Sequence, residues 1–98
     1  ITDVNRAFGE QSIDVYTINE LPLRVVYQRL FDREPPSKFK WCSGSHYCVS
    51  KEQIRSKPRE FWIKAIDLSR IKYSNDRLHT VAHCYERLLY HIYCDNLS

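Results

Sequence analysis

The sequence contains few of the residues that characterise fibrous or disordered chains. Its 98 residues include only two glycines and four prolines. This composition excludes a collagen-like repeat and argues against a long disordered segment. There is no glycine-rich phosphate loop, so the chain alone offers no standard nucleotide cradle. No run of about 20 apolar residues occurs, so we expect no transmembrane segment.

Methionine is absent as well, and the chain begins with Ile1. A translated protein starts with methionine, so we expect a processed product or a fragment. Residues 1–98 are therefore interpreted as a single domain or as the C-terminal portion of a larger domain. The sequence predicts no particular cellular compartment.

The charge balance is mild. Fifteen basic and twelve acidic side chains give a net charge of +3, and 43% of the residues are apolar. These values are typical of a globular protein. Basic residues gather near Trp41 and Tyr47, but Glu52 and Glu60 interrupt them. A dedicated nucleic-acid binder needs a denser basic stripe, so nucleic acid is not an expected partner.

Four cysteines, Cys42, Cys48, Cys84 and Cys94, leave two alternatives open. They can form disulfides in any of three pairings, or remain as buried thiols. With His91, they can also be considered as zinc ligands. The Cys42–Cys48 spacing is looser than in usual zinc sites, which makes buried or bridged cysteines the better interpretation.

Hydrophobic spacing predicts a helix over about 20–32. Leu23, Val26, Tyr27 and Leu30 fall on one helical face, and Pro35-Pro36 ends the segment. Upstream of it the period is unclear. There, Ile13, Val15 and Tyr16 can form a short strand, or the stretch can be an irregular lead-in or part of a longer element.

Residues 38–50 favour an extended segment bent at Gly44, or a hairpin, because Phe39, Trp41, Tyr47 and Val49 are strand formers. Ser50 and Gln53 then match a capping box, which predicts a short helix.

Two further helices are expected, over about 57–69 and 75–94. The first carries neighbouring stripes, Phe61, Ala65 and Leu68 beside Trp62 and Ile66, so we expect it to be broadly buried. The second has a wide apolar face and a second, aromatic and titratable stripe. The whole pattern predicts an α+β fold that is mostly helical. The members of the second stripe are His79, His83, Glu86, Tyr90 and Tyr93.

That second stripe suggests a metal site. His79, His83 and Glu86 are spaced so that all three can reach one ion from a helix, and these residue types are zinc ligands. A small zinc-binding module is thus one hypothesis. The more ordinary interpretation is a packed interface, since the spacing differs from that of known zinc helices. We therefore assign no metal ligand.

Two blocks of sequence resemble a known family. Residues 44–62 read GSHYCVSKEQIRSKPREFW, and residues 82–93 read AHCYERLLYHIY. They are similar to a "GAQFAVSREXIRXRPXXFY" block and an "ERLWHXIF" helix in glycosyltransferase-like domains of unknown function from fungi, bacteria and some viruses. The order of the blocks and the preceding helix also agree, over about residues 20–94. Ser45, His46 and Tyr47 depart from the first block, and Leu89 replaces the tryptophan of the second.

The resemblance implies the C-terminal, acceptor-side part of a larger α/β glycosyltransferase-like fold. A nucleotide sugar and a divalent metal would be bound by an upstream half, and neither is expected in this chain. Glu86 and Arg87 match the E-R pair of the second block. Glu86 would then act as the general base on an acceptor hydroxyl, and Arg87, Trp41, His46 and Tyr47 would contact a sugar or glycan acceptor.

A different class of function stays open. The chain can instead be a non-catalytic binding or assembly module. In that case the second face of the 75–94 helix would dock a partner chain, or the missing N-terminal half of the domain.

Overall fold

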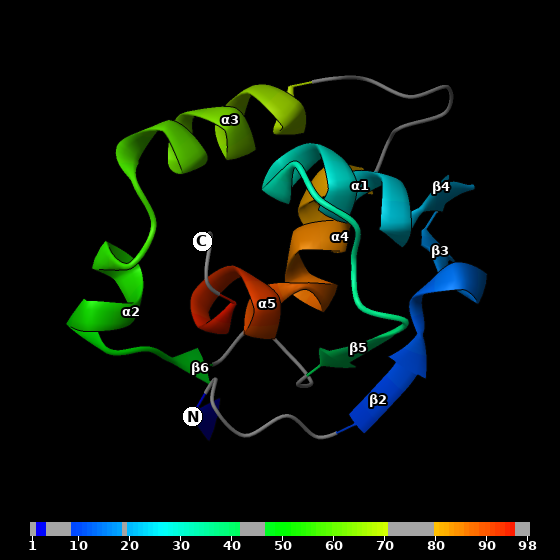
Figure 1. The fold of residues 1–98 in the computed structure, drawn as a ribbon, viewed down its shortest axis with the longest axis horizontal. Coiled ribbons are helices and arrows are strands. Elements are labelled where there is room, and N and C mark those ends of the chain that lie inside the picture. Colours follow the sequence, from blue (N-terminus) through cyan, green and yellow to red (C-terminus); the bar gives the residue numbers. More distant parts are fainter. Residues whose placement is uncertain (1, 4–8, 19, 42–46, 71–79, 96–98) are drawn as a thin grey trace.

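The computed structural model describes residues 2–3, 9–18, 20–41, 47–70 and 80–95 (Figure 1). Helices dominate, and short strands pair in twos, which confirms the predicted α+β class. The strands are β1 (Thr2–Asp3), β2 (Gly9–Ser12), β3 (Thr17–Ile18), β4 (Leu21–Pro22), β5 (Lys38–Trp41) and β6 (Tyr47–Cys48). The helices are α1 (Leu23–Phe31), α2 (Lys51–Arg55), α3 (Arg59–Ser69), α4 (Thr80–Arg87) and α5 (Leu89–Cys94), with a 3₁₀ turn η1 (Ile13–Val15).

Strands β5 and β6 do not pair with each other, so the 38–50 region is not a hairpin. Strand β5 runs antiparallel to β2, with Gln11 opposite Phe39, and β6 runs parallel to β1. Both pairings use residues from the first part of the chain. The bend expected at Gly44 lies outside the described residues.

The short strand expected at residues 13–16 is a 3₁₀ turn instead. In a strand, Ile13 and Val15 would point to the same face. In the structure Ile13 is fully buried, whereas Val15 is 81% exposed. The N–H of Ile13 donates to the carbonyl of Ser37 at 3.0 Å, which fixes the turn against the segment leading into β5.

Helix α1 confirms the face predicted from sequence, since Leu23, Val26, Tyr27 and Leu30 are all buried. It begins three residues later than expected because Leu21–Pro22 pairs with β3 as strand β4. Asn19, a residue type that suits an N-cap of this helix, lies outside the described residues.

The capping box at the start of α2 is confirmed. The N–H of Gln53 donates to Ser50 Oγ at 3.0 Å, and the N–H of Ser50 donates to Gln53 Oε1 at 2.8 Å. These two bonds satisfy backbone donors that a helix start leaves unpaired.

The prediction that the following helix is broadly buried is wrong. Phe61 is the one buried residue of α3, while Ile63 and Ile66 are 44% and 52% exposed. The reason is its position: α3 lies at the periphery and packs on α1 and α4 with one side (Figure 1). Its other side faces solvent.

The single helix expected over 75–94 is two helices in the described part, which starts at Thr80. The chain changes direction between α4 and α5 (Figure 1). Leu88 leaves helical geometry there, at φ −99° and ψ 9°. Its N–H is shared between the carbonyls of Cys84 and Tyr85, both at 3.0 Å, which tightens the last turn of α4.

This break distributes the second stripe over different surroundings. His83 is exposed, Tyr90 lies beside Lys40, and Tyr93 packs on Trp62 of α3. The described members of the stripe therefore have different neighbours.

One apolar core joins α1, β5, α3, α4 and α5. Burial of these side chains supplies the main driving force for folding. Its members are Ile13, Leu21, Leu23, Val26, Tyr27, Leu30, Phe31, Phe39, Phe61, Val81, Cys84, Leu88 and Ile92.

We predict that Leu30→Ala lowers the free energy of unfolding by about 2–5 kcal/mol, because it leaves a cavity in the core. Ile66→Ala, on the solvent side of α3, is the control and should change it by less than about 0.5 kcal/mol. Urea denaturation of both variants measures the difference. An equal loss in the two would show that the outer side of α3 is buried after all.

Candidate functional site

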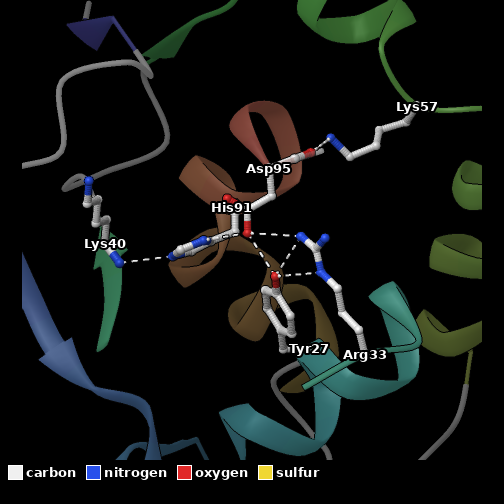
Figure 2. Close-up of polar contacts among 6 residues, drawn as sticks. All are labelled: Tyr27, Arg33, Lys40, Lys57, His91 and Asp95. Carbon is white, nitrogen blue, oxygen red and sulfur yellow. Dashed lines mark hydrogen bonds and ion pairs between the residues drawn. The ribbon is translucent and has the colours of Figure 1, made fainter. Parts of the chain in front are cut away.

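A polar network centres on His91 of α5 and joins three parts of the chain (Figure 2). The backbone N–H of Lys40 in β5 donates to His91 Nε2 at 3.0 Å. Because Nε2 accepts this bond, the neutral ring carries its proton on Nδ1. Nδ1 in turn donates to Asp95 Oδ2 at 2.9 Å. Both ring nitrogens are therefore engaged, and His91 is 4% exposed.

Asp95 is the hub of this network. Its Oδ2 also accepts a hydrogen bond from the Tyr27 hydroxyl at 2.8 Å and forms an ion pair with Arg33 Nη2 at 3.5 Å. Its backbone carbonyl accepts a hydrogen bond from the ammonium of Lys57. Asp95 thereby connects α5 to α1 and to the residues between α2 and α3 (Figure 2).

The network changes the protonation behaviour of its members. Burial alone would raise the pKa of Asp95, but hydrogen bonds from His91 and Tyr27, with the charge of Arg33, together lower it. Burial, helped by the bond to Asp95, raises the pKa of Tyr27 to about 12. Burial also lowers the pKa of Lys57.

A histidine beside a carboxylate often acts as a base, but His91 is not arranged for that task. A base needs a free nitrogen facing its substrate, and both nitrogens of His91 are bound within the chain. The same argument removes His91 from the zinc site considered with Cys94. The network therefore acts as a structural clamp.

An open cleft of about 640 Å³ lies beside the clamp, between α1, β5 and α5. The ammonium of Lys40 lies 5.2 Å from the centre of the Tyr90 ring, which is a cation–π arrangement. Glu34, which also lines the cleft, accepts hydrogen bonds from Arg24 and Gln28. The cleft is lined by Tyr27, Arg33, Glu34, Pro36, Lys38, Lys40, Tyr90, His91, Cys94 and Asp95.

A smaller cavity, of about 210 Å³, brings together two residues that the sequence singled out. Trp41 of β5 and Arg87 of α4 both line it. Tyr16 and Phe39 form an aromatic wall, with ring centres 5.1 Å apart in an edge-to-face arrangement, and Gln11 of β2 completes the lining. We call this space the Trp41–Arg87 cavity.

The position of Trp41 depends on a glycine. Its indole ring lies so close to Gly9 that a β-carbon there would come within 3.0 Å of the ring. Because Gly9 pairs with Trp41 across β2 and β5, the missing side chain makes room for the ring.

The other predicted site residues have different outcomes. Glu86 is half-buried on α4 and is not among the described residues that line the cavity. It precedes Arg87, so it points about 100° away around the helix axis. Its role as a base stays a prediction. His46 and the side chain of Tyr47 lie outside what the structure describes.

The metal hypothesis is not tested in full, because His79 lies outside the described residues. Within the described ranges, no three histidine, cysteine or acidic side chains are grouped to hold a metal ion. His83 is exposed and Glu86 half-buried. No disulfide joins any two of Cys48, Cys84 and Cys94.

Comparison of the chain with protein-family models, with curated proteins and with solved structures finds no match. Over the described parts of the chain, no helix is both long and apolar enough to cross a membrane. The glycosyltransferase-like interpretation therefore depends on the two sequence blocks and on the geometry of the site.

Sequence reasoning did not find the clamp. Asp95 carried no motif, and His91 was considered only as a metal ligand. The available signal was their spacing of four residues, which places two side chains on one helical face. The sequence could not show that Lys40 and Tyr27 belong to the same network, because they lie on other elements of the fold.

The lowered pKa of Asp95 predicts how stability depends on pH. A depressed carboxyl pKa stabilises the fold above its unfolded value, near 3.8, and this stabilisation is lost as the pH falls through the folded value. Asp95→Asn should cost about 1–3 kcal/mol at pH 7. The difference from wild type should shrink on acidification to about pH 3.

Denaturation at several pH values measures this difference, and Asp67→Asn, at an exposed position on α3, is the matched control. It should differ little from wild type throughout. A difference for Asp95→Asn that stays constant with pH would contradict the clamp.

Proposed function

We propose that this chain is the acceptor-side part of a nucleotide-sugar-dependent glycosyltransferase-like domain, and that the Trp41–Arg87 cavity holds the acceptor sugar. One observation carries the proposal. Trp41 and Arg87, selected from sequence as substrate-binding residues and located on different elements, line the same cavity.

The lining suits a saccharide. Aromatic rings offer flat apolar faces to the C–H groups of a sugar ring, while the Arg87 guanidinium and the Gln11 amide offer hydrogen bonds to its hydroxyls. The cavity is smaller than the roughly 300–1,000 Å³ typical of pockets for drug-sized ligands. It therefore suits one sugar unit.

The proposed chemistry is transfer of a glycosyl group to an acceptor hydroxyl. In the role that the resemblance implies, Glu86 would take the hydroxyl proton as the oxygen forms a bond to the anomeric carbon of the donor. It would act from beside Arg87, outside the described lining of the cavity. The bond from that carbon to the nucleotide diphosphate breaks, and the diphosphate leaves with its electron pair. The upstream half that the resemblance implies would bind the donor and a divalent metal.

A second candidate function is supported by the exposed apolar side chains of α2 and α3. Ile54, Ile63 and Ile66 are 47%, 44% and 52% exposed. An assembly module would dock a partner there. This surface is an alternative to the second face of the C-terminal helix, where Tyr93 packs on Trp62.

In a protein that contains this chain and transfers sugar, Glu86→Gln should lower the turnover rate by about 10²–10⁴-fold, because an amide cannot accept the proton. Circular dichroism should show an unchanged fold. The matched control is Glu60→Gln, on the exposed start of α3, which should retain activity. Full activity of Glu86→Gln would remove Glu86 from the role of base.

A further inference from the structure

Two hydrogen-bond donors at the Trp41–Arg87 cavity lack partners within the described part of the chain. Trp41 Nε1 is buried and has no hydrogen-bond acceptor there. Arg87 makes no hydrogen bond or ion pair with any described residue. A buried donor without an acceptor costs free energy, and such groups are rare in folded proteins. Both donors are thus left without a hydrogen-bond partner among the described residues.

The charge of the lining residues indicates which chemical group a ligand would bring to the cavity. Arg87 is the one charged residue among the described residues that line the cavity. The acidic groups of the nearby clamp and cleft are engaged elsewhere, Asp95 by His91 and Arg33, and Glu34 by Arg24. Among its described lining residues, the cavity therefore combines one positive charge with aromatic walls and no acidic side chain.

We propose that the ligand of the Trp41–Arg87 cavity is an acidic sugar, a uronic acid whose carboxylate binds Arg87. This inference rests on the proposed function, and it specifies the substrate class of the same site. A carboxylate matches the planar fork of a guanidinium, which can donate two parallel hydrogen bonds. The sugar ring lies against the aromatic wall.

The geometry around β5 supports this arrangement. The Trp41 ring is held by its approach to Gly9, and Phe39 is fully buried in the core. The aromatic part of the cavity is thus positioned before any ligand binds, which reduces the entropic cost of binding.

Tryptophan fluorescence tests the inference, because the chain contains only Trp41 and Trp62. Trp62→Phe leaves Trp41 as the single reporter, and phenylalanine keeps an aromatic contact with Tyr93. In this background we would titrate glucuronate, glucose and benzoate. Glucuronate should bind with about tenfold or greater preference over glucose, since a charge-assisted bond is added.

Variants at Arg87 test whether this residue causes the preference for glucuronate over glucose. Arg87→Gln should abolish it, and Arg87→Lys should retain part of it, because lysine keeps the charge but lacks the fork. Arg55→Gln, at an exposed position on α2, is the matched control and should leave it unchanged. A preference that survives Arg87→Gln would overturn the inference.

The three ligands separate failure of the inference from failure of the proposed function. Equal binding of glucose and glucuronate would overturn the acidic specificity and leave the acceptor site standing. Benzoate binding as tightly as glucuronate would support a carboxylate site but contradict a sugar site. No response to any of the three would overturn both.

Discussion

The hydrogen bond from the Lys40 N–H to His91 is the interaction on which the arrangement of the molecule depends. Strand β5 pairs with β2 along one edge, and on the other edge Lys40 would have an unpaired donor. His91 satisfies that donor, and Asp95 holds the imidazole in the tautomer that can accept. The position of β5 is therefore set from both sides.

The consequences extend to the site. Phe39 and Trp41 flank Lys40 in β5, so fixing Lys40 also fixes one residue in the core and one at the cavity. Tyr27, Arg33 and Lys57 add bonds to Asp95 from α1 and from the segment before α3. A buried histidine–aspartate pair thus positions the candidate binding site without touching its ligand.

Local signals in the sequence predicted local structure well. The face of α1 and the capping box at Ser50 and Gln53 depend on neighbouring residues and were confirmed. Helix breaks and strand pairings depend instead on residues that are distant in the sequence. Sequence could not show that Leu88 interrupts the last helix, nor that β5 pairs with residues 9–12. The sequence also could not show that α3 lies at the periphery, because the apolar pattern of a helix does not reveal whether another element covers it.

The candidate site shows the same division. Residue type selected Trp41 and Arg87, since an aromatic ring and a guanidinium suit a sugar acceptor. Their sharing one cavity, the gap left by Gly9 and the buried indole N–H are properties of the folded chain. No spacing in the sequence encodes them.

The central claim is that the cavity lined by Trp41 and Arg87 binds an acidic sugar. Heteronuclear NMR resolves the two tryptophan indole N–H groups of the chain and can follow both during titration with glucuronate. The account predicts that the Trp41 resonance moves and saturates, because the ligand enters the cavity that Trp41 lines, while that of Trp62 stays in place. A Trp41 resonance that does not move at saturating ligand would contradict it.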